Sequence, residues 1–304
     1  HGGGIRFADR GALWRVARDP ELQFGELFSA GRLQVEGDLI EVLGRIYDAA
    51  GSGRHARSTF LPLWHGHGLR SRGLAAARSN ARHHYDLGNA FYARWLDRDA
   101  MQYTCAYFPD PGLTLEAAQR AKMDHICRKL RLMPGQRVFE AGCGWGGLAL
   151  HMAREYGVSV RAWNVSREQV AWATERARAA GLGDRVRFVQ DDYRNIRGTC
   201  DAFVSVGMLE HVGPEHYPAL GAVIDRALTD HGLGLVHSIG RNQPMTMNPW
   251  IERRIFPGAH PPAISEMMRL FEPWGFSVLD LENLRLHYAR TLRHWLNRYL
   301  ASAD

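Results

Sequence analysis

A glycine-rich turn at residues 142–147 sets the strongest limit on how this chain folds: Gly142-Cys143-Gly144-Trp145-Gly146-Gly147. It follows a short apolar stretch at 138–141, and residues 148–156 behind it have the composition of a helix. A strand, a tight turn and a helix in this order predict one βα unit of a parallel sheet. Glycine has no Cβ, so the turn can approach a ligand closely, and the free N–H groups at the helix start favour a phosphate or a carboxylate.

More strands with polar residues at their ends follow this unit. The pattern predicts strands at 158–165, 186–190 and 201–206, and final strands at 234–239, 277–280 and 284–288. Asn164, Asp192 and Glu210 come where three of these strands end. This succession resembles the class I S-adenosylmethionine-dependent methyltransferases. The resemblance implies an α/β, Rossmann-like fold with a mostly parallel seven-stranded sheet.

Composition narrows the class of protein. The chain has 304 residues, of which 45% are hydrophobic and 23% are charged, as in an ordinary globular protein. A run of about 18 apolar residues, which a membrane span needs, is not present. The four cysteines show no paired spacing, which indicates a reducing cytoplasm and no metal site.

The net charge of +6 comes mostly from arginine. Basic clusters at 70–82 and 285–298 favour an anionic membrane surface, and no nucleic-acid-binding signature is evident. A GC-rich genome that favours arginine over lysine would give the same excess. From the basic clusters and the unpaired cysteines we expect a cytoplasmic protein that is associated peripherally with the inner face of the membrane.

The chain is predicted to have a small N-terminal helical domain at 1–53, a linker at 54–80 and a catalytic domain at 81–304. Residues 11–50 are expected to be helical, with Asp19 and Asp38 beginning two helices. The N-terminal domain is either a structural cap or a module that docks on lipid. The linker holds His65 and His67, which have no Cys or acidic neighbours, so no metal is predicted there. An insertion at about 243–268 is expected to form a lid over an acyl channel, and an amphipathic helix is expected at 264–274.

Eight motifs, in order along the chain, resemble the cyclopropane fatty acid synthases. They are His84-Tyr85-Asp86-Leu87-Gly88-Asn89, Tyr103-Thr104-Cys105-Ala106-Tyr107-Phe108, Glu140-Ala141-Gly142-Cys143-Gly144-Trp145-Gly146, Ser166-Arg167-Glu168-Gln169, Gly207-Met208-Leu209-Glu210-His211-Val212-Gly213, Val236-His237-Ser238-Ile239-Gly240-Arg241, Trp250-Ile251-Glu252-Arg253-Arg254-Ile255-Phe256-Pro257-Gly258 and His287-Tyr288-Ala289-Arg290-Thr291-Leu292. The resemblance covers about residues 20 to 298. It implies transfer of a methylene group from S-adenosylmethionine to a cis double bond of an unsaturated phospholipid acyl chain. A homodimer is a possible assembly.

The resemblance also implies the site residues. A bicarbonate ion would act as the base, held through the backbone of Cys105 and Ile239 and the side chains of Glu210, His237 and Tyr288. The cofactor would be held by Tyr103, Thr104, Glu140, Gly142, Gly144, Gly146, Asn164, Gln169, Asp192 and Tyr193. Asn164 and Tyr193 depart from the family pattern, which usually has Thr-Leu-Ser at the end of the second strand and Trp near the adenine.

Taken singly, each catalytic candidate has a structural explanation. Glu210 could belong to an exposed turn, His237 could be a core histidine with satisfied hydrogen bonds, and Tyr288 could be core packing. Their joint occurrence in motif order favours the catalytic interpretation. Alternatives are C-methylation that gives a methyl- or methylene-branched chain, a lipid-binding or regulatory protein without catalysis, and an N- or O-methyltransferase of small molecules.

Overall fold

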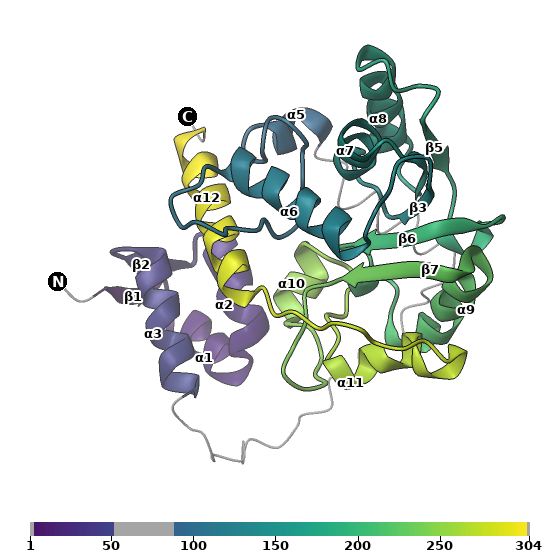
Figure 1. The fold of residues 1–304 in the computed structure, drawn as a ribbon. Coiled ribbons are helices and arrows are strands. Elements are labelled where there is room, and N and C mark those ends of the chain that lie inside the picture. The colour runs from purple at the N-terminus through teal and green to yellow at the C-terminus, as the bar shows by residue number, and fades with distance from the viewer. Residues whose placement is uncertain (1–2, 52–87, 303–304) are drawn as a thin grey trace. The chain divides into compact units, whose positions relative to one another are not determined.

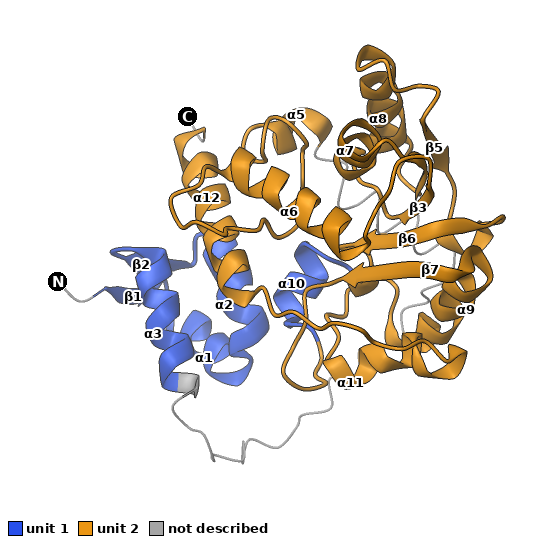
Figure 2. Cartoon of the chain, viewed as in Figure 1, with its two compact units in different colours: residues 1–71, 247–257 blue, residues 72–246, 258–304 orange. Residues whose placement is uncertain are grey.

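The structure is a computed structural model that describes residues 3–51 and 88–302 (Figure 1). The predicted linker at 54–80, His65 and His67, and residues 84–87 of the first family motif lie outside the described residues. The chain divides into two compact units (Figure 2). Unit 1 comprises His1–Ser71 and Met247–Pro257, and unit 2 comprises Arg72–Thr246 and Gly258–Asp304.

The sequence predicts a purely helical N-terminal domain, but unit 1 also contains two strands. Strands β1 (Gly4–Phe7) and β2 (Leu33–Glu36) pair antiparallel, with helices α1 (Arg10–Arg18) and α2 (Pro20–Ser29) between them and α3 (Leu39–Gly51) after them. Gly31 and Gly37, at φ +69° and +95°, stand on either side of β2 and allow the backbone to leave the helical region. The predicted helix starts are confirmed, because Asp19 and Asp38 accept hydrogen bonds from backbone N–H groups of α2 and α3.

Helix α10 (Pro249–Arg254) belongs to unit 1 although it lies within the insertion at 243–268. It packs on α2, where a Cβ on Gly25 would come within 2.5 Å of the Trp250 ring. Beside this contact, Arg254 donates to both carboxylate oxygens of Glu26, at 2.8 and 2.5 Å. The middle of the insertion is therefore held by the N-terminal unit.

Unit 2 is built on a five-stranded parallel sheet in the order β5-β4-β3-β6-β7. The strands are β3 (Arg137–Ala141), β4 (Ser159–Asn164), β5 (Val186–Gln190), β6 (Cys200–Val206) and β7 (Leu228–His237). Four of them match predicted strands closely, and β7 starts six residues earlier than expected. Short apolar runs bounded by turn residues are typical of strands buried on both faces, so the sequence predicts these strands.

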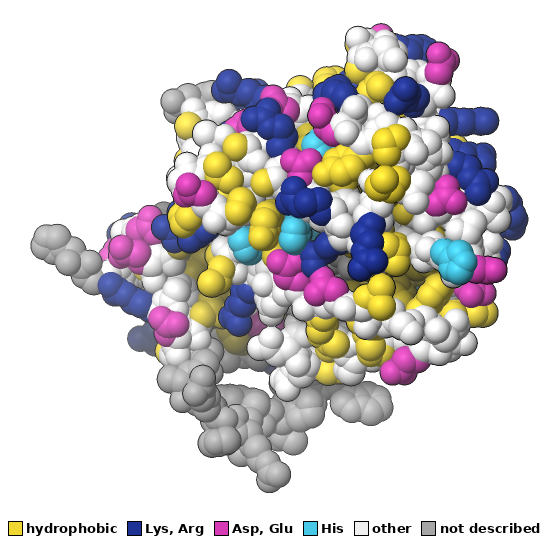
Figure 3. All heavy atoms as spheres, viewed as in Figure 1, with side chains coloured by type: hydrophobic (Ala, Val, Ile, Leu, Met, Phe, Trp, Pro, Cys, Tyr) yellow, Lys and Arg dark blue, Asp and Glu magenta, His cyan; other side chains and the backbone are white. Residues whose placement is uncertain are grey.

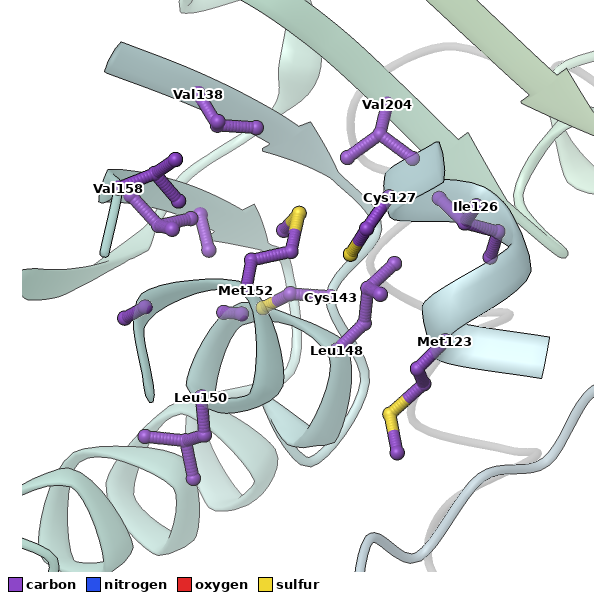
Figure 4. Close-up of a cluster of buried hydrophobic side chains, with 14 of the residues drawn as sticks. Met123, Ile126, Cys127, Val138, Cys143, Leu148, Leu150, Met152, Val158 and Val204 are labelled. Atoms are coloured by element: carbon purple, nitrogen blue, oxygen red, sulfur yellow. The ribbon is translucent and has the colours of Figure 1, made fainter. Parts of the chain in front are cut away.

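Alternate residues of the central strands enter two different cores. Val138 and Val204 pack with α6 (Leu115–Lys129), α7 (Gly147–Tyr156) and α8 (Arg167–Ala179), and Figure 4 shows part of this core. Phe139 and Phe203 point to the other side, toward α9 (Tyr217–Ala227). Side chains alternate along a strand, so Glu140 points to the same side as Val138. Four short helices lie between these elements or before them in this unit: α5 (Gly88–Ala93), η1 (Tyr193–Asn195), η2 (Leu209–His211) and η3 (Pro214–His216).

The strands predicted at 277–280 and 284–288 are wrong, so the described sheet has five strands and not seven. Residues 277–284 have no regular structure, and α12 (Arg285–Ala301) begins directly after them. Thr291 and Trp295 are buried at helical spacing, and Arg298 bonds Glu116 of α6 at 2.7 Å. This packing fixes a helix where the local alternation of apolar and polar residues suggested a strand.

The helix predicted at 264–274 is also wrong in extent. The segment forms α11 (Ile264–Met267), η4 (Met268–Leu270) and η5 (Glu272–Trp274), with Pro273 in the last turn. A proline cannot donate the backbone hydrogen bond that a continuing helix needs. No helix of the described residues has both the length and the apolar character needed to span a membrane. On the face shown in Figure 3, basic, acidic and apolar side chains are interspersed.

Candidate active site

The glycine turn after β3 is open to a ligand at one position. Gly142, Gly144 and Gly146 all have positive φ, at +82°, +52° and +78°. A Cβ on Gly146 would meet the Phe188 ring at 2.5 Å, and one on Gly142 would meet Met208 at 2.8 Å, whereas one on Gly144 would meet nothing within 4 Å. Gly142 and Gly146 therefore allow close packing, and Gly144 leaves open space at the turn.

Two predicted cofactor residues lie side by side next to Gly144. Asn164 Nδ2 donates to Gly144 O at 3.2 Å and to Gln169 Oε1 at 2.7 Å. Gln169 is almost fully buried, and its Nε2 has no hydrogen-bond partner among the described residues. A buried amide donor without a partner is costly, so this group is available for a ligand such as a ribose hydroxyl.

Asp192 does not present a free carboxylate. Its Oδ1 accepts from Arg194 Nε at 2.7 Å and its Oδ2 from Arg194 Nη2 at 3.0 Å. The guanidinium also lies 5.3 Å from the centroid of the Tyr193 ring. Burial raises the pKa of Tyr193 to about 12, so the ring is neutral and offers an apolar surface. Tyr193 fits a stacking role, and the Asp192 carboxylate is engaged in holding Arg194.

Three of the residues predicted to hold the base, Glu210, His237 and Ile239, lie at the carboxyl ends of β6 and β7. The Ile239 N–H donates to Glu210 Oε1 at 2.6 Å. Glu210 Oε2 and His237 Nδ1 are both buried, and neither has a partner within the described part of the chain. Cys105 Sγ and Tyr288 N both donate to Leu284 O, at 3.9 and 2.9 Å. Burial raises the pKa of Tyr288, and the charge of Glu210 raises it further. We call Cys105, Glu210, His237, Ile239 and Tyr288 the anion wall.

The protonation states in the anion wall follow from burial. Burial raises the pKa of Glu210 to about 6, although the Ile239 N–H opposes the rise. Burial lowers the pKa of His237 to about 4, so the imidazole is neutral near pH 7. Burial raises the pKa of the Cys105 thiol to about 11, which removes its nucleophilic character.

The turn after β6 connects the anion wall to the cofactor side. Gly207 N donates to His237 O at 2.9 Å, and a Cβ on Gly207 would come within 2.6 Å of Thr104 Cγ2. The next residue, Met208, packs on Gly142. The structure therefore brings Thr104, Gly142 and His237 to one end of the sheet.

Tyr103 lies in an aromatic cluster. Its ring centroid is 5.1 Å from that of Trp95 and 5.3 Å from that of Trp295. Trp145, from the glycine turn, and Tyr288, from the anion wall, belong to the same cluster. Such a wall excludes water and presents aromatic faces, which attract positive charge.

Sequence reasoning missed three buried polar residues. Gln102, Gln119 and Lys122 connect α6 to the segment that carries Tyr103, Thr104 and Cys105. The available signal was the i, i+3 spacing of Gln119 and Lys122, which places both on one face of a helix. Nearby, Glu140 is buried, and its Oε2 lacks a partner among the described residues.

A parallel sheet with an open glycine turn, an amide pair beside it and an aromatic wall defines a class I methyltransferase, and its unpartnered buried donor suits S-adenosylmethionine. The comparisons with known proteins agree. The family model for mycolic acid cyclopropane synthetase matches residues 73–304. The chain belongs to this family, and it is an S-adenosylmethionine-dependent methyltransferase of the cyclopropane fatty acid synthase type.

Individual relatives include a probable fatty acid methyltransferase of Pseudomonas putida, 40% identical over 90% of this chain and 70% of that protein. The cyclopropane-fatty-acyl-phospholipid synthase of Escherichia coli K12 is 44% identical over 73% of this chain and 56% of that protein. The crystal structure of mycolic acid cyclopropane synthase CmaA1 complexed with SAH and CTAB has a TM-score of 0.70 and 29% identity, over 75% of this chain and 84% of that one. The chain thus spans little more than half of the Escherichia coli enzyme.

Proposed function

We propose that the protein transfers a methyl group from S-adenosylmethionine to the cis double bond of an unsaturated phospholipid acyl chain and closes a cyclopropane ring. The observation that carries this proposal is the buried Glu210 carboxylate, at the end of the sheet where the glycine turn lies. Its Oε1 accepts from the Ile239 N–H, and its Oε2 has no hydrogen-bond partner among the described residues. A proton-accepting wall is what an alkene methylation needs, because the methylated chain carries a positive charge until it loses a proton.

Bound S-adenosylmethionine would supply an electrophilic methyl group. The residues around it would orient the alkene, keep water out and receive charge. The aromatic faces of Tyr103 and Tyr288 suit the positive charge on the acyl chain. The neutral His237 adds no competing positive charge at pH 7. The thiol of Cys105 stays protonated and does not compete as a nucleophile.

We further propose that a bicarbonate ion completes the wall as the proton acceptor. Two buried polar atoms, Glu210 Oε2 and His237 Nδ1, have no hydrogen-bond partner among the described residues. A small polar ion between them would supply the missing hydrogen bonds. The Ile239 N–H is engaged with Glu210 Oε1, so an anion would share or replace that bond. Glu210 would orient bicarbonate by accepting its proton in a hydrogen bond.

An anionic membrane surface is the proposed source of substrate. Helix α1 exposes Leu13 at 48% and Trp14 at 72%, and it carries Arg10, Arg15 and Arg18. A helix with exposed aromatic and basic side chains suits the interface of an anionic bilayer. Replacing Trp14 with alanine should weaken sedimentation with vesicles that contain phosphatidylglycerol. Replacing Trp172 of α8, which is 40% exposed, is the matched control and should not.

The deciding experiment incubates the chain with methyl-labelled S-adenosylmethionine and vesicles of a monounsaturated phospholipid, with saturated vesicles as the control. Label in the unsaturated acyl chains alone, lost in Glu210→Gln, is the expected result. Label that goes only to soluble amines or phenols would reject the lipid assignment.

C-methylation without ring closure is the second candidate, and it keeps the same fold and site. The name of the Pseudomonas putida relative, probable fatty acid methyltransferase, favours it. A cyclopropane and a methylene branch have the same mass, so NMR of the extracted lipid is needed to separate them. Cyclopropane protons are expected, and vinylic protons from a methylene group would select the second candidate.

A further inference from the structure

Lys122 is an unusual residue to find buried. Its side chain projects from α6 and is 2% exposed, although an ammonium group is rarely removed from water without strong partners. Nζ donates to Thr104 Oγ1 at 2.9 Å and to Gln102 Oε1. Both partners belong to the segment that leads into Cys105.

Gln119, one turn earlier on α6, holds the same segment through its backbone. Gln119 Nε2 donates to Thr104 O at 2.9 Å and to Gln102 O at 3.3 Å. The Asp97 carboxylate anchors the start of the segment by accepting from Gln102 N at 2.6 Å. Residues 102–104 are therefore fixed by side-chain bonds on both sides of Tyr103.

Burial lowers the pKa of Lys122 to about 8, so its ammonium group is mostly protonated at pH 7 and its charge acts on neighbouring groups. It opposes the effect of burial on Glu140 of β3, whose pKa burial raises to about 8. It also opposes the rise of the Cys105 pKa and lowers the pKa of His237 beyond the effect of burial. Asp97, Glu140 and Cys105 are the titratable groups that face Lys122, and Lys122 and Glu282 are those that face His237.

We propose that Lys122 is a positioning residue for methyl transfer, which fixes residues 102–104 between the glycine turn and the anion wall and supplies that wall with a buried positive charge. The charge favours an anion at the wall, and it adds to the burial that keeps His237 neutral. The effect of Lys122 on a bound anion rests on the proposed function. Its positioning of residues 102–104 does not, because that role follows from the contacts with Thr104 and Gln102.

The test compares Lys122→Met with Gln119→Met in the full chain. Both variants loosen the hold on Thr104, but only the first removes a charge. Binding of S-adenosylhomocysteine, followed by calorimetry, should weaken in both. The His237 titration, followed by NMR of labelled imidazole, should move to higher pH only in Lys122→Met. Label transfer at limiting bicarbonate should fall about tenfold more in Lys122→Met than in Gln119→Met, which corresponds to about 1.4 kcal/mol.

Equal behaviour of the two variants in the titration and in transfer would overturn the proposal. Lys122→Gln keeps an N–H donor for Thr104 without the charge, so it replaces Lys122→Met if that variant does not fold, with the same expectations. If the wild type labels no lipid, the proposed function fails, while the titration and cofactor binding still decide the role of Lys122.

Discussion

Glu210, the side chain proposed to hold the base, should weaken the fold. Its pKa is raised by burial from 4.5 to about 6, so the folded chain binds this proton more tightly than the unfolded chain. The difference corresponds to about 2 kcal/mol of unfolding free energy at 1.36 kcal/mol for each pH unit. Stability from this residue is therefore highest below pH 4.5, falls as pH rises to 6, and stays low above it.

Glu210→Gln removes the charge but keeps an oxygen that accepts from the Ile239 N–H. The variant should be about 2 kcal/mol more stable than the wild type at pH 8, and less than about 0.5 kcal/mol more stable at pH 4.5. Urea unfolding followed by tryptophan fluorescence at the two pH values measures this difference. Glu155→Gln, at an exposed site on α7, is the control and should change stability by less than about 0.5 kcal/mol at both. A variant that is no more stable at pH 8, or a gain independent of pH, would refute the reasoning.

Three further outcomes test other parts of the structure. Gly146→Ala should lower the unfolding free energy by about 3 kcal/mol in urea unfolding, because of left-handed backbone strain and overpacking. Gly144→Ala should lower it by only about 1 kcal/mol and should chiefly weaken the binding of S-adenosylhomocysteine, which calorimetry measures. Thr291→Val should cost about 1–3 kcal/mol in the same unfolding assay, because the buried N–H of Ala106 loses its acceptor at 3.0 Å; no loss would mean that α12 is not docked there. The four cysteines are buried with raised pKa values, so a thiol reagent at pH 8 should label them only after denaturant is added, and fast labelling of the folded chain would contradict this burial.

Much of the catalytic fold could be predicted because its signals are local. The strand before Gly142 is a short apolar run, and Thr114 caps α6 by accepting from Ala117 N at 3.2 Å, as its position before an acidic first turn indicates. The error at 284–288 arose because five residues alternate in polarity. Thr291 and Trp295, one and two turns further on, decide in favour of a helix.

The site was only partly predictable, because its geometry depends on contacts between distant segments. The Glu210–Ile239 bond requires the ends of β6 and β7 to be adjacent, which motif order suggests but does not establish. The burial of Lys122 follows from how α6 packs, and a lysine at that spacing is more often exposed. The bond between Arg194 and Asp192 is local, yet nothing in the sequence says which partner the carboxylate takes.

The central claim is that the glycine turn and the anion wall face one space. A crystal structure of the full chain with S-adenosylhomocysteine and bicarbonate measures this directly. We expect the sulfur to point from the side of Gly144 toward Tyr288, with the small ion bonded to Glu210 and His237. A sulfur directed away from these side chains, or an ion bound elsewhere, would contradict the account.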